Sequence, residues 1–149
     1  MTTTHAGSAG AGTVNFNGIN VSGLGDGGLT LSVISTDLAG NVSSVRTVTV
    51  TKDTTAPGAP TVAYTDNNNT ADVVSGTAEA NASISVTKTA PAPTAGYSTT
   101  ANGAGAFSAT VAIENGKPNT PISVTYTVTA TDAAGNTSSV STLSFSDTH

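Results

Sequence analysis

One internal repeat constrains this chain more than any other feature of its sequence. Residues 35–45 read STDLAGNVSSV and residues 130–140 read ATDAAGNTSSV, so eight of eleven positions are identical. The two copies start 95 residues apart, and the Asp-Thr pair at residues 53–54 recurs at residues 147–148. A repeat of this length within 149 residues predicts a modular chain whose unit is about 95 residues long.

Apolar and polar residues alternate strictly in the segment that leads into the second copy. Residues 122–131 carry Ile, Val, Tyr, Val and Ala at even positions and Ser or Thr at odd positions. This period of two is typical of a half-buried antiparallel strand, and β-branched threonine suits its wetter face. No helical periodicity of useful length appears in the chain, so the sequence predicts an all-β fold.

The repeat divides the chain into two expected domains. Residues 53–149 form one complete unit that opens with the linker Asp53–Pro57, and residues 1–52 form the C-terminal half of a preceding unit. Turn-forming residues separate seven expected strands in the complete unit and three in the half-unit. These strands span residues 60–65, 73–79, 83–89, 96–101, 106–113, 121–131 and 139–146, and residues 13–22, 28–36 and 44–52. Seven short alternating strands predict tandem immunoglobulin-like antiparallel β-sandwiches, and the chain lacks the Cys–Trp–Cys core of antibody domains.

The half-unit carries an apolar face for which the sequence shows no partner sheet. Three strands with one apolar face are marginal alone and leave open edges. Three explanations stay open: the other half is missing by truncation, a neighbouring chain completes residues 1–52 by strand addition, or loops shield a smaller domain. We expect truncation. The residues of this face include Val14, Phe16, Leu29, Leu31, Val33, Val48 and Val50.

The charge and composition of the chain argue against several classes of function. Nine Asp and Glu against four Lys and Arg give a net charge of −5, which disfavours binding to nucleic acid or to an anionic membrane. No apolar run approaches the roughly 18 residues of a membrane span. Cysteine is absent and the two histidines stand at positions 5 and 149, so no Ser-His-Asp or Cys-His site can form. We predict a protein that is not an enzyme, does not bind nucleic acid and does not insert into membranes.

Acidic residues gather at the expected junction between the two units. Because successive strands of a sandwich alternate in direction, the turn that holds Asp132 and Asn136 should approach Asp53 in the linker. Asp26 is expected near the same junction. Clustered carboxylates repel unless a cation lies between them, and calcium accepts six to eight oxygen ligands. The alternative is a hairpin turn whose Asp and Asn bond their own backbone.

A second acidic group is expected at the opposite end of the complete unit. There Asp147 should approach Asp66, Asn68, Asp72 and Glu114, and a solvated turn is the alternative at residues 66–72. Asp37 and Asn41 repeat Asp132 and Asn136 in the half-unit. The candidate calcium ligands are Asp53, Asp132, Asn136, Asp26, Asp37, Asn41, Asp66, Asp72 and Asp147.

Three motifs together carry a resemblance to a known family. The linker Asp53-Thr-Thr-Ala-Pro57, the paired Thr-Asp-x-Ala-Gly-Asn turns and Val74-Ser-Gly-Thr-Ala78 resemble the tandem bacterial Ig-like repeats of giant RTX and biofilm-associated adhesins, which are exported by type I secretion. The resemblance covers nearly the whole chain. It implies a spacer module at the bacterial cell surface, stacked on neighbouring repeats of its parent chain, stiffened by structural Ca²⁺ and supporting adhesion and biofilm formation.

Two other functions remain as alternatives to the spacer. The first is a glycan-binding module that uses the loops within residues 90–105, with Tyr97 as the main residue for stacking on a sugar. The second is a filament or sheath subunit whose N-terminal half accepts a strand from a neighbour.

Overall fold

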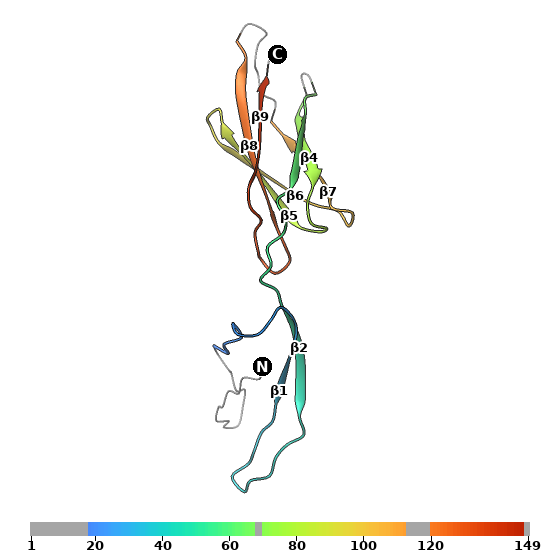
Figure 1. Cartoon of the computed structure of the whole chain (residues 1–149), viewed down its shortest axis with the longest axis vertical. Helices are drawn as coiled ribbons and strands as arrows, with labels where there is room; N and C mark the ends of the chain where they lie inside the picture. The colour runs from blue at the N-terminus through green and yellow to red at the C-terminus, as the bar shows by residue number, and fades with distance from the viewer. Residues whose placement is uncertain (1–17, 68–69, 113–119, 148–149) are drawn as a thin grey trace. The chain divides into compact units, whose positions relative to one another are not determined.

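The computed structural model describes residues 18–67, 70–112 and 120–147, and every regular element in these ranges is a β-strand (Figure 1). The chain divides into two compact units, Met1–Asp53 and Thr54–His149. This boundary lies one residue after the one expected from the repeat. No helix in the described ranges is long and apolar enough to cross a membrane. The all-β prediction is confirmed.

Unit 2 is a sandwich of two antiparallel sheets that enclose one core (Figure 1). Each of the seven strands expected here is present. The first sheet has the order β3-β4-β7 and the second the order β6-β5-β8-β9. The strands are β3 (Thr61–Thr65), β4 (Asp72–Thr77), β5 (Ser83–Ala90), β6 (Ala95–Thr100), β7 (Ala106–Val111), β8 (Ile122–Thr131) and β9 (Ser141–Asp147).

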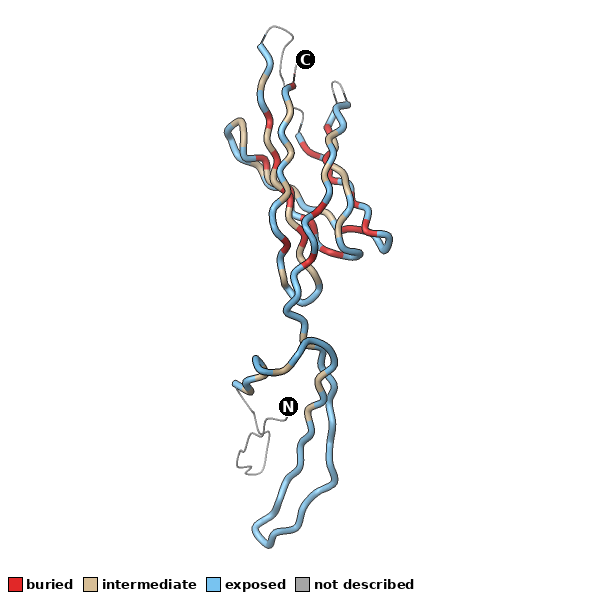
Figure 2. The backbone as a smooth tube through the Cα atoms, viewed as in Figure 1, coloured by how far each residue is buried: buried red, intermediate tan, exposed pale blue. Residues whose placement is uncertain are grey.

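The core of unit 2 follows from the alternation in its strands. On β8, Val124, Tyr126 and Val128 are completely buried while the threonines between them stay half-exposed. The Tyr64 ring of β3 stacks on Phe145 of β9 with centroids 3.7 Å apart, and this contact joins the two sheets. Figure 2 shows the buried residues concentrated along these facing strands.

The outer surface of the sandwich is rich in hydroxyl groups that pair across neighbouring strands. The side-chain oxygens of Thr61 and Thr77 lie 2.7 Å apart, and those of Thr125 and Ser144 lie 3.0 Å apart. Such cross-strand pairs stabilise a sheet without adding charge.

The last residue of the expected linker packs against the sandwich at the start of unit 2. Pro57 and Pro60 are buried, and the hydroxyl of Ser141 donates a hydrogen bond to the carbonyl of Pro60. Proline fixes its own backbone angle φ, so this segment has little freedom. The Asp53–Pro57 linker is therefore part of unit 2 at its C-terminal end.

In the described part of unit 1, the regular structure is a single antiparallel hairpin of β1 (Gly27–Val33) and β2 (Arg46–Lys52). Both strands are shorter than the expected spans 28–36 and 44–52 at the end next to the connecting turn. Figure 2 shows that most of this hairpin is exposed.

The expected strand at residues 13–22 is wrong over its described part, because residues 18–22 form no strand. Gly18 takes a positive φ of 69°, the N–H of Leu24 bonds the carbonyl of Val21, and the N–H of Ser22 bonds the side chain of Asn20. In residues 18–22 the apolar residues alternate with Gly, Asn and Ser, which favour turns, and the segment forms a turn instead of a strand. Residues 13–17 lie outside the described residues.

Candidate metal sites

The Asp132 turn is held by its own side chains. One carboxylate oxygen of Asp132 accepts the N–H groups of Ala134 at 2.8 Å and Asn136 at 2.9 Å, and the other accepts the Asn136 amide at 2.8 Å. Gly135 adopts the positive φ of 93° that closes the turn. The hydrogen bond from the Asn136 side chain is the largest cause that lowers the pKa of Asp132, so the carboxylate stays charged at neutral pH.

Unit 1 builds the same turn from the same motif. Asp37 accepts the N–H groups of Ala39 at 2.9 Å and Asn41 at 2.8 Å, and its second oxygen accepts the Asn41 amide at 2.8 Å. The Asn41 side chain is again the largest cause that lowers the pKa of the aspartate. Both copies match the self-bonded alternative, and calcium binding by these four side chains stays a prediction.

A third turn of this geometry uses an amide in place of the carboxylate, and the sequence reasoning missed it. The side-chain oxygen of Asn102 accepts the N–H groups of Ala104 at 2.9 Å and Ala106 at 3.0 Å, and Gly105 has a φ of 84°. The missed signal was the shared pattern of an Asx residue three positions ahead of glycine. Because a neutral amide forms this turn, the turn geometry itself requires neither negative charge nor a metal ion.

The junction residues lie in different units. Asp53 ends unit 1, whereas Asp132 and Asn136 belong to unit 2. Their expected approach to one another therefore stays a prediction.

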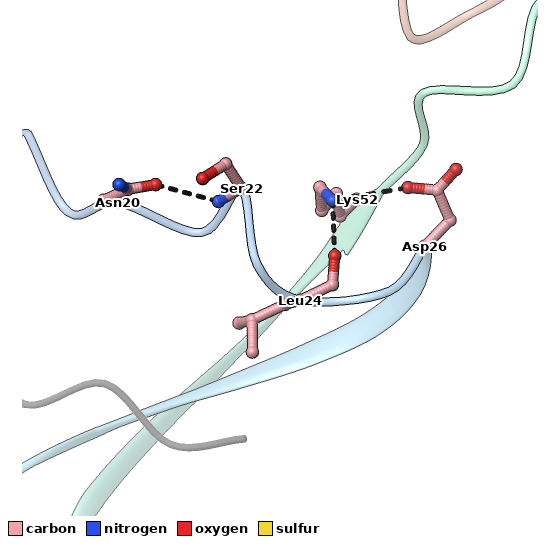
Figure 3. Close-up of polar contacts among 5 residues, drawn as sticks. All are labelled: Asn20, Ser22, Leu24, Asp26 and Lys52. Atoms are coloured by element: carbon pink, nitrogen blue, oxygen red, sulfur yellow. Dashed lines mark hydrogen bonds and ion pairs between the residues drawn. The ribbon is translucent and has the colours of Figure 1, made fainter.

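Asp26 has a cation close by within unit 1 (Figure 3). The ammonium of Lys52 lies 3.6 Å from the Asp26 carboxylate and donates a hydrogen bond of 2.5 Å to the carbonyl of Leu24. This contact ties the turn before β1 to the end of β2. The positive charge of Lys52 partly neutralises the Asp26 carboxylate. This weakens the argument that Asp26 requires a calcium ion to balance its charge.

At the far end of unit 2, buried carboxylates surround one tyrosine. The Tyr64 hydroxyl donates a 2.7 Å hydrogen bond to Asp72, whose other oxygen accepts the N–H of Asn67 at 3.1 Å. Asp72 and Asp147 are only 3% and 4% exposed, while Asp66 is exposed. No motif in the sequence indicates that Tyr64 joins these residues.

The pKa of the Tyr64 hydroxyl is raised by its surroundings. Burial raises this pKa most, followed by the hydrogen bond to Asp72 and then by the charges of Asp72, Asp66 and Asp147. All three carboxylates contribute to this rise, and their expected role as calcium ligands stays a prediction. The other two residues expected here, Asn68 and Glu114, lie outside the described residues.

The fit of calcium to this end can be judged from the donor atoms. Carboxylate oxygens are the ligands that calcium prefers. Within the described ranges, however, no three His, Cys, Asp or Glu side chains group closely enough to hold a metal ion. Asp66, Asp72 and Asp147 therefore do not hold an ion by themselves in this arrangement, and an ion near Tyr64 would need backbone carbonyl or water oxygens.

Tyr97 is poorly placed for stacking on a sugar. It is half-buried, packs against the core and pairs with Val86 on β5. Its hydroxyl accepts the N–H of Ala112 at 3.1 Å. The ring therefore belongs to the interior side of the sheet, which weakens the glycan-binding alternative.

The two sheets, their strand order and the repeated turns define an immunoglobulin-like sandwich module. The family model described as bacterial Ig domain matches residues 56–147, and the chain belongs to this family. The expected kinship with bacterial Ig-like repeats is confirmed.

A solved structure with the same fold is described as "Crystal structure of tetra-tandem repeat in extending region of large adhesion protein". It aligns with a TM-score of 0.54 and 23% sequence identity, covering 89% of this chain and 34% of the solved chain. This chain thus spans about a third of the length of that chain. The search of curated proteins gave no match.

Proposed function

We propose that this chain is a segment of the extending region of a bacterial surface adhesin, located outside the cell and without catalytic function. The observation that carries the proposal is the repetition of one hairpin and its Asp-x-Ala-Gly-Asn turn 95 residues apart within one chain. Tandem units of one kind suit a protein that spans distance. The similar solved structure, which is itself named as an extending region, supports the same reading.

The module resists bending through its sheets and its short linker. Antiparallel strands run through unit 2, and the buried Pro57 and Pro60 hold the start of this unit against its sandwich. A short linker with fixed proline angles limits the range of directions that successive units can take. The module would hold a terminal binding domain away from the cell, in support of adhesion and biofilm formation.

Calcium is the proposed stiffening ion. Bound calcium would supply positive charge that neutralises neighbouring carboxylates and fixes their spacing. At the far end of unit 2, oxygens of Asp66, Asp72 and Asp147 would contribute to its coordination together with backbone carbonyl or water oxygens. Asp53, Asp132 and Asn136 are the other proposed ligands. The support is the shared influence of the first three carboxylates on Tyr64 and the charged state of Asp132.

The extender function is tested by measuring length against the number of repeats. Chains that join one, two or four copies of residues 53–147 head to tail should show a largest dimension, by small-angle X-ray scattering in millimolar calcium, that rises linearly with copy number. A flexible string of modules would grow roughly as the square root of that number. Square-root growth in calcium would contradict the extender proposal. Linear growth that EDTA leaves unchanged would contradict only the role of calcium.

A further inference from the structure

The β1–β2 hairpin of unit 1 is a structural copy of the β8–β9 hairpin of unit 2. Every described pair in one hairpin corresponds to a pair 95 residues later in the other. The end pairs are Gly27 with Lys52 and Val33 with Arg46 in unit 1, and Ile122 with Asp147 and Val128 with Ser141 in unit 2. The bridges that close the turns, Thr36–Val42 and Thr131–Thr137, correspond in the same way.

In unit 2 this hairpin is covered on its edge and on its inner face. Strand β8 pairs with β9 on one side and with β5 on the other, so both of its edges are occupied. Its inward residues Val124, Tyr126 and Val128 have no exposure, and Phe145 on β9 stacks on Tyr64 of the opposite sheet.

In unit 1 the same positions lack that cover within the described ranges. There β1 pairs with β2 alone, and the edge that corresponds to the β5 side of β8 has no strand partner. Leu29 and Leu31 are only half-buried, and Val33, Val48 and Val50 are 49%, 62% and 43% exposed. These five residues occupy the positions of Val124, Tyr126, Val128, Leu143 and Phe145. An open edge beside an apolar face is a surface that proteins normally cover.

We infer that the free edge of β1 and the apolar face of the hairpin receive the first five strands of a further Ig-like repeat, joined ahead of residue 1 in the same polypeptide. The strand that pairs with β1 is patterned like β5, where Ile84 and Val86 point inward and Ser or Thr alternate with them. A sheet patterned like β3, β4 and β7 covers the apolar face. A second copy of this chain is a poorer donor, because its own β5 is already paired with β6 and β8.

The test adds the missing half to the full chain. A copy of residues 54–112 is placed ahead of Met1, so that residues 1–26 connect the copied strands to β1. Backbone amide hydrogen exchange of β1 and β2 is compared with that of the unextended chain, and the amides of β8 serve as internal reference. We expect exchange in the hairpin to slow by about a hundredfold or more, because a hairpin held in a cooperative unit opens far less often.

Two matched substitutions separate inner-face packing from other effects. In the extended chain Leu31→Asp, on the inner face, should abolish the slowing, whereas Thr30→Asp, on the opposite face of the same strand, should retain it. A second design joins copied residues 54–121 directly to Gly27, which reproduces the spacing between β7 and β8 in unit 2.

Three results would overturn the inference. One is unchanged hairpin exchange in both designs. Another is equal protection in the unextended monomer, which would mean that the chain covers the hairpin by itself. The third is protection of the unextended chain that appears only in a dimer by size-exclusion chromatography with light scattering, which would make a second copy the partner. None of these results bears on whether complete repeats act as an extender.

Discussion

At the scale of single residues, the far end of unit 2 depends on a tyrosine that keeps a buried carboxylate bonded. Tyr64 links β3 to Asp72 at the start of β4 and stacks on Phe145 of the other sheet. Tyr64 thus donates a hydrogen bond to the buried Asp72 carboxylate and also packs its ring against the core. The sequence predicted the strand at residues 60–65 that contains Tyr64, but the partner of its hydroxyl depends on how the strands pair.

Replacing Tyr64 should change both stability and its response to alkali. Tyr64→Phe leaves an oxygen of buried Asp72 without its donor, so we expect a loss of about 1–3 kcal/mol in the free energy of unfolding at neutral pH. The raised pKa means that the folded chain keeps a proton that the unfolded chain loses above about pH 10, so wild-type stability falls as pH rises through that value. Urea unfolding between about pH 8 and 11 should show a shallower decline for Tyr64→Phe. An equally steep decline would contradict this account.

Gly76 is required where β3 and β4 approach closely. A Cβ at this position would collide with the carbonyl of Thr61 and come within 3.1 Å of the Phe107 ring. Gly76→Ala should lower the free energy of unfolding by about 1–3 kcal/mol in chemical denaturation. Gly96→Ala is the matched control, since a Cβ on that strand glycine meets nothing within 4 Å. Equal effects of the two substitutions would refute a steric cause.

At the scale of elements, alternation and turn residues predicted every strand of unit 2 and both strands of the described part of unit 1, but they also predicted a strand at residues 13–22 whose described part forms none. Residues 122–131 alternate over ten positions and form β8 over that same span. Residues 18–22 alternate over too few positions, and Gly18 and Asn20 turn the chain instead. The repeated motif predicted where the Asp132 turn lies. The sequence left open whether the Asp132 carboxylate binds calcium or the backbone of its own turn, because a carboxylate beside an amide suits either.

The three related turns allow a direct test of what the carboxylate contributes. Asp132→Ala removes the acceptor and should lower the melting temperature by several degrees. Asp132→Asn should retain it, because Asn102 forms the same turn. The lowered pKa of Asp132 stabilises the fold above the ordinary aspartate pKa, and this stabilisation is lost as pH falls through the folded value. The difference in melting temperature between wild type and Asp132→Ala should therefore be smaller at about pH 3 than at about pH 7, whereas the difference between Asp132→Asn and Asp132→Ala should not change. A large loss for Asp132→Asn at pH 7 would point to a ligand role instead.

At the scale of the whole molecule, the chain repeats one module, and its proposed calcium sites lie at the module ends. Ion binding to the folded state raises stability by mass action, by about 2.7 kcal/mol at a hundred times the dissociation constant. We expect EDTA to lower the melting temperature of unit 2 by about 10 °C or more.

Matched variants assign that shift to particular carboxylates. Asp147→Asn should reduce the difference between calcium and EDTA, whereas Glu79→Gln, an exposed carboxylate away from the three around Tyr64, should leave it unchanged. Differential scanning calorimetry in each buffer gives the comparison. The same melting temperature in calcium and in EDTA would remove the support for the calcium proposal.

The hydroxyl pairs on the outer faces of the sandwich have a consequence for the medium in which the protein works. Pairs such as Thr125 with Ser144 and Thr61 with Thr77 hold neighbouring strands without opposite charges. Dissolved monovalent salt screens ionic attraction but leaves bonds between neutral hydroxyls intact. We therefore expect the pairing of these strands to be almost independent of the concentration of monovalent salt, from fresh water to brine.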